Sequence, residues 1–428
     1  DGTGVRDIAV SNGRIAAIST AAEPITGGAP DVIDCSGLHI LPGVIDSQVH
    51  FREPGLTHKE DLETGSRAAV AGGVTVVFEM PNTNPLTTTP EALADKVAAA
   101  RGRMFCDFAF YVGATRENID EIPTLERLEA SAGMKVFMGS STGNLLVDDE
   151  GSLDRIIARL SRRAAFHSED EDRLIAREGL RRPGDPTSHP EWRDVEAAMI
   201  STRRLVALAE KHRRRVHVLH ISTGDEMAFL KDHREWASVE VTPNHLTLAA
   251  PECYERLGTF AQMNPPVRDA AHQARIWQGV RDGTVDVLGS DHAPHTREEK
   301  HHAYPASHSG MTGVQTLVPI MLDHVNAGRL TLERFVDLTS HGPQRLFGLT
   351  AKGRIAAGYD ADFTIVDLKR RQTITHGWIE SRCGWTPFDG KEVTGWPVGT
   401  MIRGRRVMWD GEILGPAHGD AVRFHEAG

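Results

Sequence analysis

Cysteine is scarce in this sequence, and long apolar runs and net positive charge are absent. The four cysteines among 428 residues show no CxxC spacing, which argues against a disulfide framework and a cysteine zinc site. They are Cys35, Cys106, Cys253 and Cys383. No apolar segment reaches membrane-spanning length, and the first residues have neither a basic region nor an apolar signal core. We therefore expect a cytoplasmic protein in a reducing compartment.

The formal net charge is -11 at pH 7, which argues against a general nucleic-acid surface or an anionic membrane as the partner. Solubility is all that the charge implies directly. A chain of 428 residues forms either two or three average domains or one large α/β barrel with an accessory domain. The internal pattern favours the second arrangement.

Eight short apolar segments alternate with helical patterns through the middle of the chain. The expected strands are Val44–Phe51, Val74–Glu79, Asp107–Val112, Lys135–Gly139, Ala164–Ser168, Arg215–Ser222, Ser238–Thr242 and Val285–Ser290. The clearest expected helices are His58–Ala71 after a Thr57 cap, Pro90–Ala100 and Glu191–His212. This alternation predicts an α/β protein with a (β/α)8 barrel over residues 43–352. A doubly wound sheet is the alternative architecture.

Both ends of the chain consist of short strands and turns. The Asn12-Gly13 pair between Asp7–Val10 and Arg14–Ile18 indicates a hairpin, and Asp362–Asp367 and Met401–Met408 are the clearest strands near the other end. We expect residues 1–42 and 353–428 to form one β-sandwich domain that is discontinuous in sequence.

The first barrel strand delivers polar side chains directly to its end. Strand side chains alternate with period two, so Gln48, His50 and Arg52 point to one face while Val49 and Phe51 pack on the other. The alternative is a strand end with incidental polar residues, and this stretch alone does not decide between the two.

Four other expected strands also present chemically active side chains, one at its first residue and three at or near the strand end. These are Lys135, His167, His220 and Asp291. Because barrel enzymes place their chemistry where the strands end, we expect these residues to meet His50 at one barrel mouth. Imidazole and carboxylate groups suit zinc and similar ions, and an aspartate there can also accept a proton from water. His217 and His220 can face opposite sides of their strand, so only His220 is taken as a ligand.

Lys135 does not fit a metal site as an ammonium ion. It fits if its amine has reacted with CO₂, because a carbamate is an anionic two-oxygen group that can bridge two metals. The alternative is a lysine with a buried stem and an amine in water, which is more common for lysines in general.

At this point the sequence resembles the cyclic amidohydrolases, and among them the type I dihydroorotases of bacteria. The matching segments span nearly the whole chain and include LPGVIDSQVHFREPG, TVVFEMPNTNP, MKVFMGSSTG, FHSED, VHVLHIST, VTPNHL, MNPPVR and GSDHAPHT. The resemblance implies a barrel with a metal centre of one or two zinc ions. By motif, Lys135 is the carboxylated bridging lysine, and His167 and His220 hold one metal. His50 helps to hold the other, and Asp291 is both a ligand and the catalytic base.

The resemblance also implies a substrate, dihydroorotate, which is a cyclic ureide that carries a carboxylate. Arg52, Asn82 and His295 supply hydrogen-bond donors to it, whereas Asn264 and the loop at Ser309 and Gly310 touch its ring. Arg52 is the residue that discriminates, because allantoinases tend to carry asparagine there and dihydropyrimidinases lack the Arg-Glu-Pro-Gly run. The alternative for Arg52 is a structural salt bridge with Glu53 or Asp46.

One residue departs from the family pattern, in which His-x-His ends the first strand. Here Gln48 stands at the first histidine position, and a neutral amide oxygen is a weaker metal ligand than imidazole. We therefore expect the metal site nearest this strand to bind weakly or to stay empty.

The function expected from these features is metal-dependent interconversion of dihydroorotate and N-carbamoyl-L-aspartate, the reaction of pyrimidine biosynthesis. One alternative is hydrolysis of another cyclic ureide, in the manner of an allantoinase or hydantoinase. The other is a weakly active subunit that scaffolds aspartate transcarbamoylase. We expect a homodimer or a higher homo-oligomer.

Overall fold

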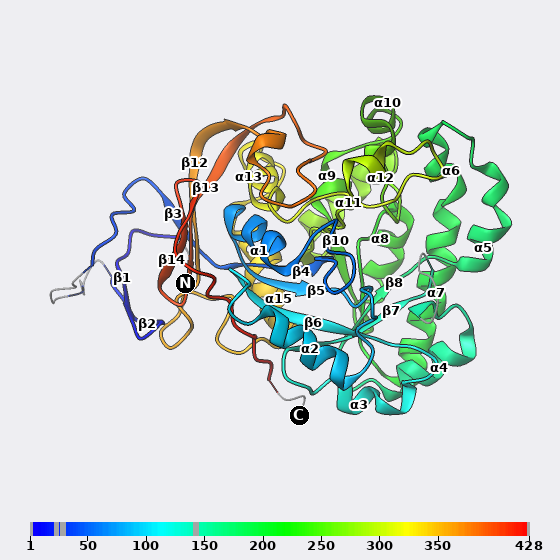
Figure 1. The fold of residues 1–428 in the computed structure, drawn as a ribbon, viewed down its shortest axis with the longest axis horizontal. Coiled ribbons are helices and arrows are strands. Elements are labelled where there is room, and N and C mark those ends of the chain that lie inside the picture. The colour runs from blue at the N-terminus through cyan, green and yellow to red at the C-terminus, as the bar shows by residue number, and fades with distance from the viewer. Residues whose placement is uncertain (1–2, 21–24, 26–30, 140–144, 426–428) are drawn as a thin grey trace.

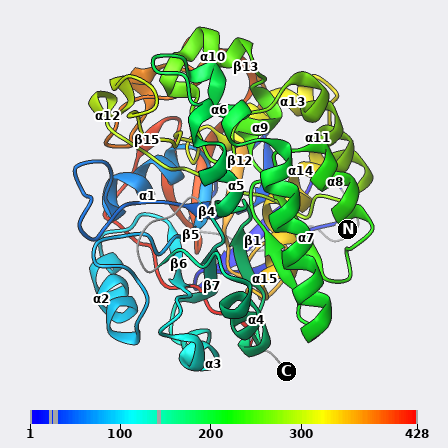
Figure 2. The same ribbon diagram turned by 90° about the vertical axis from the view of Figure 1, so that its right-hand side faces the viewer.

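The structure, a computed structural model, describes residues 3–20, 25, 31–139 and 145–425. Eight parallel strands form one sheet in chain order, with helices around it (Figures 1 and 2). They are β4 (Val44–Val49), β5 (Val74–Glu79), β6 (Asp107–Gly113), β7 (Ser131–Phe137), β8 (Ala164–His167), β9 (Val216–Val218), β10 (Ala237–Val241) and β11 (Val287–Leu288). A parallel bridge between Val49 and His292 closes the ring. The barrel prediction is confirmed, and the unreversed strand order excludes a doubly wound sheet.

Fifteen α-helices occur within the described residues, and none is both long and apolar enough to cross a membrane. They are α1 (Leu62–Ala71), α2 (Pro90–Ala100), α3 (Ile122–Leu125), α4 (Glu150–Arg159), α5 (Glu171–Ala176), α6 (His189–Trp192), α7 (Val195–His212), α8 (Gly224–Lys231), α9 (Pro243–Thr247), α10 (Glu252–Leu257), α11 (Ala270–Asp282), α12 (Arg297–His301), α13 (Leu317–Asn326), α14 (Leu332–Val336) and α15 (Gly342–Phe347). The bounds predicted for α2 are correct, and proline at its first position explains why they could be read from sequence.

Two helices begin later than predicted. Helix α1 begins at Leu62 because Asp61 and Thr64 cap it reciprocally: Asp61 Oδ1 accepts from the Thr64 amide at 2.8 Å. The preceding segment therefore remains a turn. Helix α7 begins at Val195, where Asp194 accepts from the Ala197 amide at 3.0 Å. Hydrogen-bonding caps override the apolar periodicity in both cases.

Strand β7 begins four residues before Lys135, where the prediction had it start. Ser131 already pairs with Phe110 of β6, so the strand runs from Ser131 to Phe137. Lys135 consequently lies near the carboxyl end of β7, beside Gly113 and Ala165 of the neighbouring strands. Since the carboxyl ends form the barrel mouth, the corrected strand places Lys135 where the other expected site residues lie.

Both ends of the chain form β structure, and the two ends meet. An antiparallel sheet joins β3 (His39–Pro42) to β12 (Phe363–Thr373), β13 (Glu392–Ile402), β14 (Arg405–Trp409) and β15 (Glu412–Ile413). In Figure 1 the blue strand β3 runs beside the orange and red strands of the other end. The hairpin of β1 (Ile8–Ser11) and β2 (Arg14–Ile18) is a separate two-stranded sheet that packs against this one through Ile15. The Asn12-Gly13 turn is present as predicted, with φ angles of 50° and 77°.

A buried cluster of ion pairs connects the antiparallel sheet to the barrel. Lys352 Nζ lies 2.5 Å from Asp107 Oδ2 at the start of β6, 2.6 Å from Asp362 Oδ2 just before β12, and 3.0 Å from Asp360 Oδ2. Arg403 also pairs with Asp107. Because these charges satisfy one another away from water, removing one partner would leave the others uncompensated. This cluster lies at the amino-terminal end of β6, away from the mouth.

Candidate metal centre

The closure of the barrel brings the first and last strand ends together. Asp46 Oδ1 accepts from the amides of Ser290, at 2.9 Å, and Gln48, at 3.2 Å, which ties β4 to the segment after β11. Asp291 follows this join with a φ of 47°. Its Oδ1 accepts from Gln48 Nε2 at 3.0 Å and lies 3.3 Å from His50 Nε2. The structure therefore unites His50, Gln48 and Asp291 as one group.

His167 and His220 form a second group on the neighbouring strands. His167 is the last residue of β8, and His220 follows β9 with a φ of 38°. His167 Nδ1 and His220 Nε2 are 3.0 Å apart, and both side chains are buried. Two ligands on one tetrahedral zinc ion are about 3.3 Å apart, given Zn–N bonds of about 2.0–2.1 Å. The spacing of the two nitrogens is thus close to that of two ligands of a single ion.

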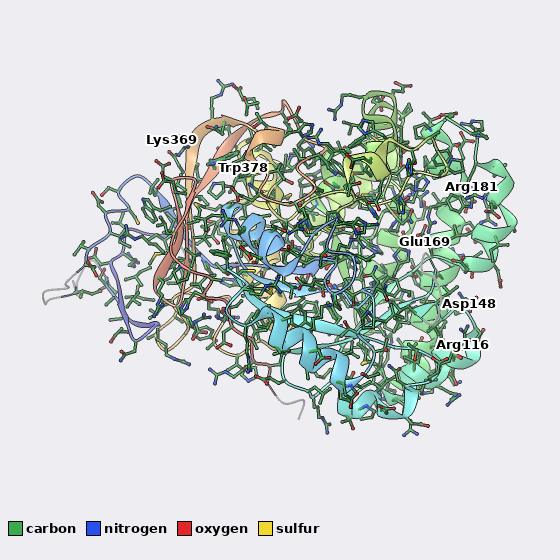
Figure 3. The ribbon with its side chains drawn as sticks, in the orientation of Figure 1. Arg116, Asp148, Glu169, Arg181, Lys369 and Trp378 are labelled. Carbon is green, nitrogen blue, oxygen red and sulfur yellow. The ribbon has the colours of Figure 1, made fainter. Side chains whose placement is uncertain are left out.

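A carboxylate and an arginine fix the orientation of His167. Glu169 Oε2 lies 2.7 Å from His167 Nε2, and Arg193 grips both oxygens of Glu169 at 3.1 and 2.6 Å. Burial raises the pKa of Glu169, but Arg193, His167 and Arg268 together outweigh burial and hold the pKa of this carboxyl well below its usual range. An ionised Glu169 can only accept, so His167 Nε2 carries the proton and Nδ1 presents its lone pair to His220. Glu169 is labelled in Figure 3, on the α5 and α7 side of the molecule.

Lys135 has a buried amine with no hydrogen-bond partner among the residues that the structure describes. Burial lowers the pKa of Lys135 to about 7, although Asp291 and Glu240 act in the opposite direction. A lysine with this pKa is substantially neutral near pH 7, and the neutral amine is the form that reacts with CO₂. An unpartnered buried amine is costly, so this side chain suits a further covalent or coordinating role.

These residues fit a divalent cation. Burial lowers the pKa of His50, His167 and His220, so each imidazole is neutral near pH 7 and offers a lone pair. Within the described part of the chain, His220 Nδ1 and Gln48 Oε1 are also buried without partners. Gln48 turns its amide nitrogen, the atom that cannot bind a cation, toward Asp291. The His167 and His220 side is therefore better equipped for a metal than the Gln48 side.

The tightest group of possible metal ligands in the described ranges lies elsewhere. His295, Glu299 and His308 offer ligand atoms that are all within 4.8 Å of one another. Lys59 Nζ lies 3.0 Å from Glu299 Oε1 and 3.1 Å from His295 Nδ1, so a cation already occupies this group. Within the described residues, no three of the ligand atoms of His50, Asp291, His167 and His220 lie within 4.8 Å of one another.

Arg52 is a buried guanidinium, 7% exposed, with a φ of 65°. Its Nε donates to Pro294 O at 3.2 Å, and one terminal nitrogen lies 3.3 Å from His295 Nε2. No carboxylate oxygen of the described residues lies within 4.0 Å of it. The salt-bridge alternative for Arg52 is therefore wrong. Glu53 instead pairs with Arg103, at 2.8 Å.

The other residues expected around a substrate are placed as follows. Asn82 Oδ1 accepts from His50 Nδ1 at 2.7 Å, which leaves His50 Nε2 free of a proton and directed at Asp291. Asn264 Oδ1 is 3.0 Å from His189 Nε2, and His295 Nε2 is 3.1 Å from Ser309 O. At Gly310 the φ is 146°, and a Cβ would lie only 2.4 Å from Ala293 O, so the loop requires glycine there. His295 links this loop to Arg52.

Sequence reasoning missed several residues that support the site, namely Lys59, Glu169, Arg193 and Glu240. Glu169 carried a readable signal, because a carboxylate two residues after a ligand histidine is well placed to orient it. Glu240 is buried inside the barrel, where it accepts from Ser47 Oγ at 2.8 Å. Arg193, Lys59 and Glu240 carried no signal of their own, because only the fold brings them to the site.

A closed parallel barrel with imidazoles, a carboxylate and an unpartnered lysine at its strand ends defines the class of metal-dependent barrel hydrolases. The chain belongs to the amidohydrolase family, which it matches over residues 39–407. This family is generally metal-dependent.

Relatives with an assigned name match nearly the whole chain. A dihydroorotase of Halobacterium salinarum is 37% identical over 98% of this chain and 97% of that protein. A dihydroorotase of Methanothermobacter thermautotrophicus is 36% identical over 95% of this chain and 92% of its own. Among solved structures, an L-hydantoinase (dihydropyrimidinase) from Arthrobacter aurescens matches with a TM-score of 0.94 and 31% identity, covering 99% and 96% of the two chains.

Proposed function

We propose that this chain is a metal-dependent dihydroorotase, which interconverts dihydroorotate and N-carbamoyl-L-aspartate. The observation that carries the proposal is Arg52, a buried cation without a carboxylate partner among the described residues, on the same strand end as His50. A buried charge needs compensation, and the substrate carboxylate supplies it. Relatives named dihydroorotase at 36–37% identity over nearly the full length support the same reaction.

The proposed metal centre uses His167, His220, Lys135 and Asp291 as its firm ligands, with Lys135 carboxylated. His50 and Gln48 form the weaker side. The proposed ion is zinc, and it supplies Lewis-acid polarisation of the ring carbonyl and a lowered pKa for the attacking water. One ion or two can be held, and the neutral amide of Gln48 favours one.

Asp291 acts as the proposed proton carrier in ring opening. Its carboxylate takes a proton from the attacking water as the new C–O bond forms at the ring carbonyl. It then returns this proton to the ring nitrogen as the C–N bond breaks, which yields the open-chain carbamoyl acid. The reverse sequence closes the ring, with loss of water. The hydrogen bond from Gln48 Nε2 to Asp291 Oδ1 holds the carboxylate at the mouth for both directions.

The substrate carboxylate binds to Arg52, Asn82 and His295 in this proposal, and the ring lies against Asn264 and the loop at Ser309 and Gly310. Arg52 and His295 are already in contact, at 3.3 Å, so one anion can reach both. The His50–Asn82 hydrogen bond supports this arrangement, because it joins the asparagine proposed to bind substrate to a histidine proposed to bind metal. The proposed substrate-binding residues and the proposed metal ligands are therefore in direct contact on one side of the site.

The test is a substrate panel on purified protein with measured metal content. Dihydroorotate, carbamoyl-aspartate, hydantoin and dihydrouracil are assayed side by side, and metal per chain is determined by mass spectrometry. We expect turnover of the first two and loss of turnover on chelation. Metal-loaded protein that opens hydantoin but neither carboxylate-bearing substrate would replace this proposal with the hydantoinase alternative. That alternative is favoured by the close fold match to the Arthrobacter L-hydantoinase.

Assembly is part of the proposal. Residues 1–42 and 353–428 form the accessory domain and 43–352 the catalytic barrel of a cytoplasmic homodimer or higher homo-oligomer. Light scattering of the purified chain, alone and with aspartate transcarbamoylase, tests the oligomer and the scaffold alternative together. A chain without turnover that forms a stoichiometric complex would favour the scaffold.

A further inference from the structure

Lys59 lies in the turn between β4 and α1, and its ammonium group is buried against the substrate side of the mouth. The side chain is 7% exposed. Its Nζ lies 3.1 Å from His295 Nδ1 and 3.0 Å from Glu299 Oε1. Neither the metal centre nor the proposed substrate contacts use this residue, although it touches one of the residues placed at the substrate carboxylate.

The ammonium group of Lys59 determines the protonation pattern of His295. Two groups face His295 Nδ1: Lys59 Nζ, which can only donate, at 3.1 Å, and Glu299 Oε2, which can only accept, at 3.6 Å. The Lys59 contact is the shorter, so Nδ1 accepts and the proton of the neutral ring is on Nε2. His295 Nε2 lies 3.1 Å from Ser309 O, the distance of an N–H donating to a carbonyl. The same Nε2 lies 3.3 Å from a terminal nitrogen of Arg52. The Ser309 O contact is the shorter of the two, so Nε2 donates to Ser309 O and does not accept from Arg52. The N–H donors of His295 and Arg52 then lie side by side, which is the arrangement that a carboxylate requires.

The same ammonium group occupies the position that a metal ion would take. His295, Glu299 and His308 present ligand atoms within 4.8 Å of one another, the right chemistry for zinc. Lys59 is within hydrogen-bond distance of two of the three. The rings of His295 and His308 have centroids 4.9 Å apart, so the third ligand lies beside the first. Without Lys59, the side chains of His295, Glu299 and His308 would surround a space that a cation could fill.

We propose that Lys59 is a positioning residue that presents His295 to the substrate as an Nε2–H donor and excludes metal from the His295–Glu299–His308 group. The first half rests on the proposed function, because it concerns a substrate carboxylate. The second half does not, because it concerns metal binding by the chain alone. Excluding metal from this group protects substrate binding, since zinc bound to His295 would prevent this histidine from donating a hydrogen bond to the substrate.

The first experiment counts zinc in wild-type protein and in Lys59→Met after equilibration with zinc and removal of excess. We expect Lys59→Met to retain one zinc per chain more than the wild type. Lys59→Met combined with His308→Ala should return to the wild-type count, because the new site loses a ligand. His308→Ala alone is the matched control and should not change the count. An equal count in wild type and Lys59→Met overturns the exclusion half.

A second measurement is made on the wild-type protein, and a variant is needed only to assign the signal. Nitrogen-15 NMR of histidine-labelled wild-type protein reports the tautomer of each ring, and the signals missing from His295→Gln assign His295. We expect a neutral ring protonated at Nε2. Protonation at Nδ1 would overturn the proposal, since Lys59 could not then donate to it.

The kinetic test uses Lys59→Met/His308→Ala, which cannot bind the additional zinc. Loss of one charge-assisted hydrogen-bond partner should raise KM for dihydroorotate by about tenfold or more, with kcat within about threefold of wild type. Lys59→Arg should recover most of the loss, because it also donates to Nδ1. An unchanged KM overturns the positioning half. If the wild type itself does not turn over dihydroorotate, the proposed function fails, while the zinc count still decides the exclusion half.

Discussion

Replacing Arg52 with methionine tests whether a buried charge serves binding at the expense of stability. Methionine matches the length and apolar stem of the side chain but removes the guanidinium. In the folded protein this group is 7% exposed and has no carboxylate within 4.0 Å among the residues described. Burial lowers the pKa of Arg52, which means that the folded state disfavours its charge. The substitution therefore removes an unfavourable group from the free enzyme and a favourable one from the complex.

The magnitude follows from the contacts that an incoming carboxylate would make. Each hydrogen bond to a charged group contributes about 1.5–3 kcal/mol, and a bidentate guanidinium contact supplies two. We therefore expect kcat/KM for dihydroorotate to fall about 10²–10⁴-fold. The hydrogen bond to Pro294 O is also lost, but the loss is offset because burial disfavours this charge more than the surrounding carboxylates favour it. The free energy of unfolding should be unchanged or higher.

The assay compares two substrates and three proteins. In Arg52→Met, kcat/KM should collapse for dihydroorotate and change little for a ureide without a carboxylate, such as dihydrouracil. Arg103→Met is the matched control: its guanidinium pairs with Glu53 at 2.8 Å and lies outside the site, so turnover of both substrates should persist. Thermal denaturation of all three proteins reports stability. Equal losses on both substrates, or a lowered Tm with dihydroorotate turnover retained, would refute the reasoning.

Four further predictions concern the metal centre. Asp291→Asn should lower kcat by about 10²–10⁴-fold with an unchanged circular dichroism spectrum; activity within tenfold of wild type would remove Asp291 as the proton carrier. Gln48→His should raise metal content per chain, and an unchanged content would mean that Gln48 does not limit the second site. Glu169→Gln should weaken metal affinity about 10–100-fold in a chelator competition, because His167 loses its orienting carboxylate; unchanged affinity would contradict this role. In metal-free protein, carbamate formation at Lys135 from ¹³C-bicarbonate should increase from pH 6 to pH 8. Its pKa is lowered to about 7, so the amine is protonated and unreactive below that pH; a signal independent of pH, or one retained in Lys135→Met, would contradict the assignment.

The barrel could be predicted from the sequence because the patterns of its strands and of its helices each lie within a short stretch of residues. Buried parallel strands appear as apolar runs, and the helices between them carry caps and amphipathic patterns. The errors arose where hydrogen bonding decided a boundary. The start of α1 depends on the Asp61–Thr64 capping box, and the start of β7 depends on pairing with Phe110, which the order of residues does not show.

The candidate site was only partly accessible to the same reasoning. Strand ends and motifs indicated His50, Lys135 and Asp291, but not that the groups would meet as His50 with Asp291 and His167 with His220. The supporting charges were missed because they come from other elements. Arg193 reaches Glu169 from the turn after α6, and Lys59 reaches His295 across 236 positions in the chain. Such contacts form only because the fold brings distant segments together, so no local sequence pattern predicts them.

The join between β4 and the segment after β11 also sets the order of events during synthesis. Gln48 and Asp291 are 243 positions apart, so at about 5–20 residues per second the ribosome needs about 12–50 s to make the second after the first. During that interval the first strand lacks one neighbour, and Asp46 lacks the Ser290 amide that it accepts in the finished ring. His50 and Gln48 therefore have no Asp291 to contact until the later part of the chain has been made. A fragment that stops before Asp291 therefore lacks one of the proposed metal ligands, although it already contains Lys135, His167 and His220.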